Sequence, residues 1–383
     1  MIQNTTVMVA GGAGFVGSAL VRELLDHGTK VVCYDNYFHG DPRHLDCVSG
    51  PLKVVQGDVL DLARLVSVLK EESVEYIVDC VGDTFVPTAY NTPQRFLDIN
   101  VQGTFNVLMA AMTCGIKRTL YVSSAEVYGD SQETLLSENA QLNPVNTYAV
   151  SKLAADRLCF TLHVEHGIPV VIARIFNCYG PRETHPYIIP EIISQLCKNR
   201  LLYLGNLQAR RDLTYVDDTA RALVAILEAD IRNGEAINVG SGTLYSVEWL
   251  AYELAEIMGV GSPEIQQDPR RLRRLDIDHF QCDNRKLLQY TRWEPRISIR
   301  EGLNRTVAWF RSNGCHWIWE GCSRDTRFVQ PRSEWSPQPW PEQGIASHTM
   351  RHADIASEFL LSRRCTDPAL GGREVRQARK SPE

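Results

Sequence analysis

The stretch VMVAGGAGFVGSAL, residues 7–20, decides the fold of this chain of 383 residues. An apolar run ends in a turn that carries glycines at positions 11, 12, 14 and 17, and an amphipathic run follows. Glycines allow a tight turn and a close approach of the backbone to a pyrophosphate at the N-terminus of the next helix. Glycine turns also occur for packing alone, so the flanking sequence has to decide what this turn binds.

A carboxylate closes the second expected strand, KVVCYD at residues 30–35. Asp35 is placed to accept hydrogen bonds from ribose hydroxyls and to repel a 2′-phosphate, which favours NAD over NADP. Asp58 and Val59, after a third strand, are placed to flank the adenine. We therefore expect NAD as the cofactor. The expected contacts are Gly11, Gly14, Phe15, Val16, Gly17, Asp35, Asn36, Asp58, Val59, Cys80, Val81, Gly82, Tyr148 and Lys152.

Short apolar runs alternate with longer amphipathic runs through the first half of the chain. Further strands are expected at residues 51–58, 75–82, 118–124 and 168–177, and helices at 93–115 and 146–167. This alternation predicts a parallel sheet with helices on both faces. Because crossover connections are almost always right-handed, we expect a doubly wound α/β sheet, a Rossmann fold, which binds ligands at the carboxyl ends of its strands.

The pattern changes after residue 175. Helices are expected at residues 187–196, 216–230, 247–259 and 300–314, and a strand near 235–241 is expected to rejoin the sheet. We expect residues 1–175 to form the NAD-binding domain and residues 176–314 to form a smaller lobe that binds substrate. Residues 325–383 are dominated by Pro, Ser and Arg, and we expect a disordered extension there.

Composition excludes several classes of protein. The chain is 44% hydrophobic and 22% charged with a net charge of -6, which is typical of a globular protein and gives no electrostatic case for nucleic acid. No apolar run approaches the ~18–20 residues that span a bilayer, and we expect no signal peptide. The eleven cysteines contain no C-x-x-C pair. We therefore expect a cytoplasmic protein without a metal site.

Tyr148 and Lys152 lie four residues apart in NTYAVSKLAADRL, on one face of an expected helix. This spacing is common on solvated helix faces. It also occurs where an ammonium group stabilises a tyrosine phenolate, which then acts as a base near neutral pH. Ser124, at the end of an expected strand, would hydrogen-bond the same substrate hydroxyl.

These residues and the motifs around them resemble those of the NAD-dependent epimerase/dehydratase family. Its members are extended short-chain dehydrogenase/reductases that modify nucleotide sugars. The motifs occur in family order over about residues 5–312: GGAGFVGS, YDN, GDV, NVQGTFNVL, VSSAEVYG, YAVSK, RIFNCYGPR and RRDLTYVDDTARAL. The resemblance implies a homodimer that pairs helices near residues 100–114 and 147–165. It also implies that Ser124, Tyr148 and Lys152 are catalytic. The substrate contacts that it implies are Thr84, Ser124, Asn177, Arg211 and Arg273.

One stretch departs from the family pattern. Many relatives carry an H-x-A-A type sequence after the fourth strand, whereas this chain has DCVGDT at residues 79–84. Asp83 and Thr84 are then expected near the cofactor or the sugar.

Glu126, two residues after Ser124, separates the activities that the resemblance implies. Relatives first oxidise the sugar at C4 to a ketone. A 4,6-dehydratase then uses a carboxylate to remove the C5 proton before water leaves from C6, and Glu126 occupies the position of that carboxylate. Ala125 stands where dTDP-glucose dehydratases have an aspartate acid, which disfavours that type. We expect dehydratase-type chemistry, with a 4-epimerase, a UDP-glucuronate decarboxylase, a reductase and a non-enzymatic NAD-binding protein as alternatives.

Overall fold

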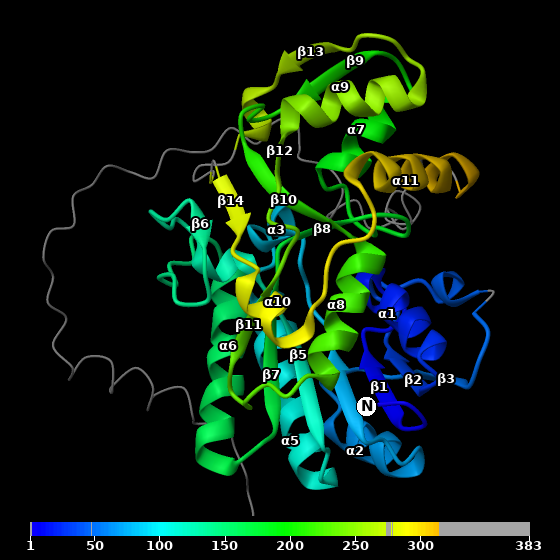
Figure 1. Ribbon diagram of the computed structural model, residues 1–383, viewed down its shortest axis with the longest axis vertical. Coiled ribbons are helices and arrows are strands. Elements are labelled where there is room, and N and C mark those ends of the chain that lie inside the picture. The colour runs from blue at the N-terminus through cyan, green and yellow to red at the C-terminus, as the bar shows by residue number, and fades with distance from the viewer. Residues whose placement is uncertain (1, 47, 273–276, 278, 314–383) are drawn as a thin grey trace, which may run out of the picture. The chain divides into compact units, whose positions relative to one another are not determined.

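A seven-stranded parallel sheet forms the centre of the computed structural model (Figure 1), which describes residues 2–46, 48–272, 277 and 279–313. The strand order is β11-β7-β5-β4-β1-β2-β3. The strands are β1 (Thr6–Ala10), β2 (Lys30–Asp35), β3 (Leu52–Gln56), β4 (Tyr76–Asp79), β5 (Arg118–Ser124), β7 (Val170–Ile175) and β11 (Ala236–Val239). The chain winds outward in both directions from β1, so a crevice opens at the carboxyl ends of β1 and β4. The doubly wound fold predicted from the sequence is confirmed.

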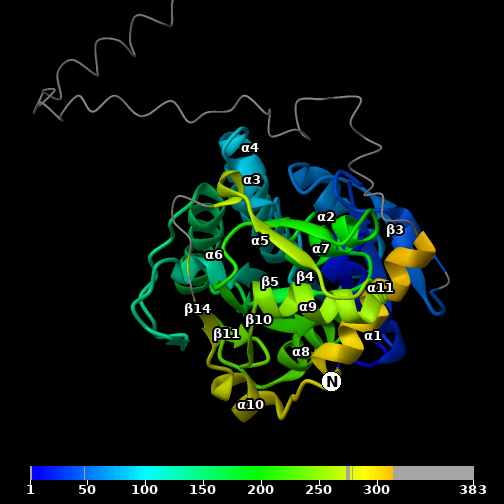
Figure 2. The same cartoon turned by 90° about the horizontal axis from the view of Figure 1, so that it is seen from above.

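Helices cover both faces of this sheet, as Figure 2 shows from above. They are α1 (Phe15–Asp26) and α8 (Val216–Glu228) on one face, and α2 (Leu62–Glu71), α5 (Thr104–Cys114) and α6 (Thr147–His166) on the other. The packing of strand β1 explains why its sequence is largely apolar. Val7 and Val9 pack into the core beneath α1 and α8, whereas Met8 and Ala10 pack into the core beneath α2 and α5. A strand buried on both faces has no polar side.

A second group of elements lies above the carboxyl ends of the central strands in Figure 1. Its main sheet has the order β12-β10-β14-β6, and β8 also pairs with β10. A separate parallel pair joins β9 and β13. The strands are β6 (Leu135–Leu136), β8 (Asn177–Tyr179), β9 (Leu201–Leu204), β10 (Arg210–Tyr215), β12 (Leu244–Ser246), β13 (Glu264–Gln267) and β14 (His279–Cys282).

Three helices enclose a second apolar core against β10. They are α7 (Ile188–Leu196), α9 (Val247–Met258) and α11 (Ile299–Asn313), and the shorter α10 (Arg285–Thr291) precedes α11. Short 3₁₀ turns lie at Pro42–Leu45, Ala125–Tyr128 and Pro269–Arg271. All described residues belong to one compact unit. The expected extension at residues 325–383 lies outside the described residues.

Two elements differ from those expected. The single helix expected at residues 93–115 is α4 (Pro93–Leu97), a π-helical segment (Asp98–Gly103) and α5, and a short α3 (Val86–Ala89) precedes them. The wider π turn lets the buried amide of Asn100 face inward, where its Nδ2 donates to the carbonyl of Asp83 at 3.0 Å. The strand expected at residues 168–177 ends at Ile175, because β8 turns away to pair with β10.

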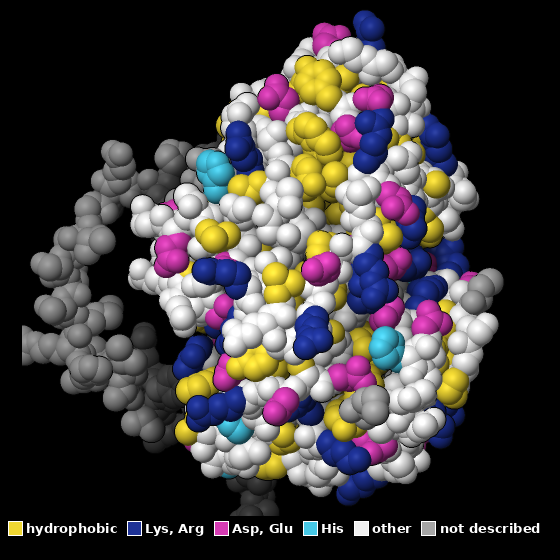
Figure 3. Space-filling model, viewed as in Figure 1, with side chains coloured by type: hydrophobic (Ala, Val, Ile, Leu, Met, Phe, Trp, Pro, Cys, Tyr) yellow, Lys and Arg dark blue, Asp and Glu magenta, His cyan; other side chains and the backbone are white. Residues whose placement is uncertain are grey.

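The surface offers no single-sign patch on the face drawn in Figure 3, where acidic and basic side chains are interspersed. Within the described residues, no helix combines the length and the apolar character needed to cross a membrane.

Candidate active site

The glycine turn between β1 and α1 is built so that only glycine fits. Gly11 has a φ of +76°, and a Cβ atom there would lie 3.1 Å from the carbonyl carbon of Cys80. A Cβ atom on Gly17 would overlap the carbonyl oxygen of Gly11. Gly14 is the N-cap of α1 and has no side chain to cap the first backbone N–H groups. These donors and the helix dipole suit an anion at this end of α1.

A carboxylate fixed by backbone donors lies at the end of β2. Oδ2 of Asp35 accepts from the N–H of Ala13 at 2.9 Å, and Oδ1 accepts from the N–H of Tyr37 at 2.8 Å. Burial raises the pKa of Asp35, and these two hydrogen bonds oppose that rise. Each oxygen keeps a further lone pair for a ribose hydroxyl. The turn and this carboxylate therefore fit the diphosphate and the adenosine ribose of NAD.

The segment after β3 closes the end of the same pocket at which the adenine is expected. Nδ2 of Asn36 donates to Oδ2 of Asp58 at 2.8 Å, and the hydroxyl of Tyr34 donates to the carbonyl of Asp58 at 2.9 Å. Val59 is buried and lines the pocket. The expected contacts that line this pocket are Gly11, Gly14, Asp35, Asn36, Val59, Cys80, Val81 and Gly82. The other expected contacts do not line it: Phe15, Val16, Gly17 and Asp58, which lie in the elements around it, and Tyr148 and Lys152 on α6.

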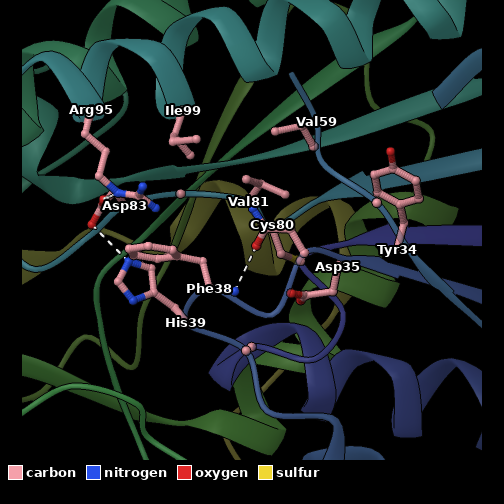
Figure 4. A pocket seen from close by; sticks show the side chains of 16 residues that line it. Tyr34, Asp35, Phe38, His39, Val59, Cys80, Val81, Asp83, Arg95 and Ile99 are labelled. Carbon is pink, nitrogen blue, oxygen red and sulfur yellow. Dashed lines mark hydrogen bonds and ion pairs between the residues drawn. The ribbon is translucent and has the colours of Figure 1, made fainter. Parts of the chain in front are cut away.

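Four side chains form a bridge at this pocket (Figure 4), and of these the sequence marked only Asp83 as close to the cofactor or the sugar. Nε of Arg95, on α4, donates to Oδ2 of Asp83 at 2.6 Å, and its guanidinium carbon lies 3.4 Å from the ring centroid of Phe38. Nε2 of His39 lies 3.2 Å from Oδ1 of Asp83. We call Phe38, His39, Asp83 and Arg95 the Asp83 bridge. It joins the loop after β2 to the loop after β4.

Asp83 is almost fully buried, yet its charge is stabilised. Burial alone would raise its pKa, but the hydrogen bonds and positive charges of His39 and Arg95 outweigh burial and lower the pKa. The departure from the family pattern at residues 79–84 therefore places an ionised carboxylate against the cofactor pocket. The only sequence signal for this was Asp83 itself, since nothing in the sequence links it to Arg95 or Phe38.

The structure brings the expected catalytic residues Ser124 and Tyr148 into contact. Ser124 ends β5, and Tyr148 stands in the first turn of α6 with its hydroxyl close enough to the Ser124 side chain for that side chain to lower its pKa. Burial raises the pKa of Tyr148; the side chain of Ser124 lowers it, and the nearby charge of Glu126 raises it. A phenolate at this site therefore needs a positive charge beside it.

Lys152 lies one turn further along α6 and is 3% exposed. Its Nζ donates to the carbonyl of Val122 at 2.6 Å. Burial lowers the pKa of Lys152 to about 8, and the carboxylate of Asp79 at the end of β4 opposes this. A Cβ atom on Gly82 would lie 3.7 Å from Nζ, so this ammonium group borders the cofactor pocket. That the Lys152 ammonium group stabilises the phenolate of Tyr148 stays a prediction.

Glu126 occupies the 3₁₀ turn that follows β5. Its backbone N–H donates to Oγ of Ser124 at 3.2 Å. Its Oε2 accepts from Nδ2 of Asn146 at 3.3 Å, and its charge acts on the pKa of Tyr148. Ser124, Glu126 and Tyr148 thus form one cluster at the carboxyl end of β5.

The expected substrate residues are more widely spread. The hydroxyl oxygen of Tyr187 lies 3.0 Å from both the carbonyl oxygen and Oγ1 of Thr84. Asn177 is exposed at the start of β8, and Arg211 lies on the adjacent β10 with Nη1 donating to the carbonyl of Ile277 at 2.6 Å. Arg273 lies outside the described residues.

Comparison with known proteins identifies a matching family and similar proteins that catalyse three different reactions. The chain matches the NAD dependent epimerase/dehydratase family over residues 7–240. It is 29% identical to a UDP-N-acetyl-alpha-D-glucosaminuronate decarboxylase of Bacillus cytotoxicus, over 79% of this chain and 97% of the relative.

Two solved structures represent the other reactions. A dTDP-glucose 4,6-dehydratase from Streptomyces venezuelae, solved with NAD bound, has a TM-score of 0.75 and 29% identity, covering 81% of this chain and 98% of its own. A UDP-N-acetylglucosamine 4-epimerase from Methanobrevibacter ruminantium has a TM-score of 0.74 and 28% identity, covering 82% of this chain and 100% of its own. The similarity is nearly equal across the three, so the site residues have to decide between their reactions.

Proposed function

Because this chain belongs to the NAD-dependent epimerase/dehydratase family, we propose that it removes water from a nucleotide-diphosphate hexose through a 4-keto intermediate. The chain is an NAD-dependent enzyme of nucleotide-sugar modification, and the product proposed is a 4-keto-6-deoxy sugar. When bound, NAD supplies the acceptor of a hydride from C4 and later the donor of that hydride to C6.

Tyr148 and Ser124 carry out the first half of the proposed reaction. Tyr148 accepts the proton of the C4 hydroxyl while C4 gives up its hydride, and Ser124 holds the same hydroxyl. Burial raises the pKa of Tyr148, so its phenolate requires positive charge. Lys152 supplies that charge below about pH 8, where its ammonium form persists.

Glu126 carries out the second half. The new ketone acidifies the C5 hydrogen, and the Glu126 carboxylate accepts it as a proton. Glu126 then passes this proton to the C6 hydroxyl, which leaves as water and gives a C5–C6 double bond. Hydride returns to C6, a solvent proton reaches C5 through Glu126, and the proton on Tyr148 goes to solvent. The net change over one cycle is the loss of one water molecule from the sugar, and the cofactor and the side chains return to their starting states.

One observation carries this assignment: the Glu126 carboxylate stands in the Ser124–Tyr148 cluster and is anchored to Asn146. A 4-epimerase returns hydride to the opposite face of the same ketone and needs no second base. Ala125 is buried next to Glu126 and offers no proton, which favours a single carboxylate acting as base and then acid.

A decarboxylase is the second candidate, because the Bacillus relative bears that name and the resembling decarboxylases carry a glutamate at this position. A panel of UDP-, dTDP-, GDP- and CDP-hexoses and hexuronates, analysed by mass spectrometry, separates the candidates. We expect loss of water from one hexose. Loss of carbon dioxide identifies a decarboxylase, and a changed sugar of unchanged mass identifies an epimerase.

A further inference from the structure

We propose that Asn146 is a positioning residue that holds Glu126 at a fixed place relative to Tyr148 through one side-chain amide. This inference rests on the proposed function, in which Glu126 is the C5 base. Asn146 is the N-cap of α6, where its Oδ1 accepts from the N–H of Ala149 at 2.8 Å. Its Nδ2 donates to Oε2 of Glu126 at 3.3 Å. The same planar group therefore links the start of the tyrosine helix to the glutamate turn.

The two partners fix the orientation of this amide. The N–H of Ala149 requires an oxygen opposite it, and the carboxylate of Glu126 requires a donor. A flipped amide would place its NH₂ against an N–H and its oxygen against a carboxylate, so both contacts would become repulsive. The cap hydrogen bond at 2.8 Å therefore keeps the NH₂ group of Asn146 directed at Oε2 of Glu126.

Helix capping alone does not call for asparagine at this position. Serine and aspartate cap helices about as well as asparagine. The serine hydroxyl keeps a proton to donate after accepting the cap hydrogen bond, but its side chain is one atom shorter and ends farther from Glu126. Aspartate would present a second negative charge to Glu126. Of these three residues, only asparagine caps α6 and also donates to the carboxylate.

The amide orients Glu126 without competing for its proton. An amide NH₂ group does not give up its proton to a carboxylate near neutral pH, so the carboxylate stays a free acceptor. With Oε2 held, Oε1 remains for the C5 proton. Tyr148 stands two residues after Asn146 on α6, so one cap sets the spacing between the residue that acts at C4 and the residue that acts at C5.

Two substitutions separate positioning from capping. Asn146→Ser keeps the cap and removes the donor to Glu126, whereas Asn146→Ala removes both. We expect the rate of solvent deuterium entry at C5 to fall about tenfold to a hundredfold in both variants, the range for losing a hydrogen bond to a charged group. The KM for the nucleotide sugar should stay within about twofold. Only Asn146→Ala should unfold at a lower temperature, by about 2–4 °C.

A third variant, Asn146→Asp, keeps the cap and sets a carboxylate against Glu126, and its deuterium entry should be the slowest of the three. If exchange in Asn146→Ser equals that of the wild type while Asn146→Ala is impaired, Asn146 is only a helix cap and the inference is wrong. If the wild-type enzyme itself takes up no deuterium at C5, the proposed function fails, and the role of Asn146 fails with it. A fall in exchange in Asn146→Ser without a lower unfolding temperature identifies the positioning role.

Discussion

The ammonium group of Lys152 is buried beside a carboxylate. Burial lowers the pKa of Lys152 to about 8, and the charge of Asp79 at the end of β4 is the largest effect that opposes burial. Burial in turn raises the pKa of Asp79 to about 6, against the opposing charge of Lys152. The two groups hold each other in the ionised state around neutral pH, which keeps a positive charge beside the cofactor pocket.

Asp79→Asn should shift the alkaline limb of the pH profile to lower pH. The ammonium form of Lys152 is present below its pKa and is lost as the pH rises through it. Without the Asp79 charge that pKa falls further, so kcat/KM should decline about one pH unit earlier. Thr104→Val is the matched control, because it removes only the 3.3 Å hydrogen bond to Asp79 and keeps the charge. An unchanged alkaline limb in Asp79→Asn would refute this coupling.

Asp35 is expected to set the preference for NAD over NADP. Asp35→Ala removes the carboxylate that is expected to accept hydrogen bonds from the ribose hydroxyls and to repel a 2′-phosphate. The ratio of the Kd for NADP to the Kd for NAD should therefore fall about tenfold or more. Titration calorimetry with both cofactors measures this ratio. Asp61→Asn, which removes an exposed charge on the N-cap of α2, should leave the ratio unchanged. Equal affinity for both cofactors in the wild-type protein would contradict the assignment.

Single residues were predictable from sequence where a local pattern marks them. The glycine turn, Asp35 and the Tyr148–Lys152 pair each stand at a fixed spacing within one element or at a strand end. Arg95 carries no such signal, because its partners Phe38 and Asp83 are distant in sequence and meet only in the folded chain. The contact between Asn146 and Glu126 is hidden for the same reason, since the two residues lie 20 positions apart.

The Asp83 bridge connects the loop after β2 to α4 and the loop after β4, beside the cofactor pocket. The proposed reaction returns the hydride to the sugar within each turnover. NAD is therefore regenerated in the site and does not have to dissociate between turnovers. We expect the bridge to slow its release. Arg95→Ala, which removes the stack on Phe38 and the ion pair with Asp83, should raise the dissociation rate of NAD about tenfold.

Stopped-flow displacement of bound NAD measures this rate. Arg95→Lys keeps the charge toward Asp83 but lacks the planar group that stacks on Phe38, so its rate should be intermediate. Equal dissociation rates in all three proteins would show that the bridge does not retain the cofactor.

Secondary structure was predictable where the chain builds the central sheet. Strands β1, β2 and β5 have apolar centres, because both of their faces are buried. The short strands β6, β12 and β14 were not predicted, because they have two to four residues and depend on long-range pairing with β10 or β14. The π-helical segment at Asp98–Gly103 also escaped prediction, because the buried polar contacts of Asn100 replace the regular helical repeat.

Two neighbouring helices expose apolar side chains on the outside of the protein. Val150, Phe160 and Val164 on α6 are 46%, 38% and 66% exposed, and their spacing places them within one face of the helix. Met112 on the adjacent α5 is 41% exposed. Single exposed apolar residues are common, but three on one face of a helix favour an interaction surface.

We therefore expect a homodimer that pairs α5 and α6 across a two-fold axis. Light scattering at micromolar concentration should give twice the mass of the chain, and the double substitution Phe160→Glu and Val164→Glu should give the monomer, because burying two carboxylates costs more than the contact supplies. Tyr252→Glu, at a 48% exposed residue of α9, should leave the dimer intact. A monomeric wild-type protein would contradict this surface.

Deuterium incorporation at C5 in Glu126→Gln tests most directly whether Glu126 is the base. The amide keeps the size of the side chain but accepts no proton. In deuterated water, the wild-type enzyme should place solvent deuterium at C5 of the product. The glutamine variant should build up the absorbance of reduced nicotinamide without deuterium at C5, whereas Tyr148→Phe should lose about 10²–10⁴-fold in turnover and show neither signal. Deuterium entry at C5 that persists in Glu126→Gln, or that is absent from the wild-type enzyme, would contradict the assignment of Glu126 as the C5 base.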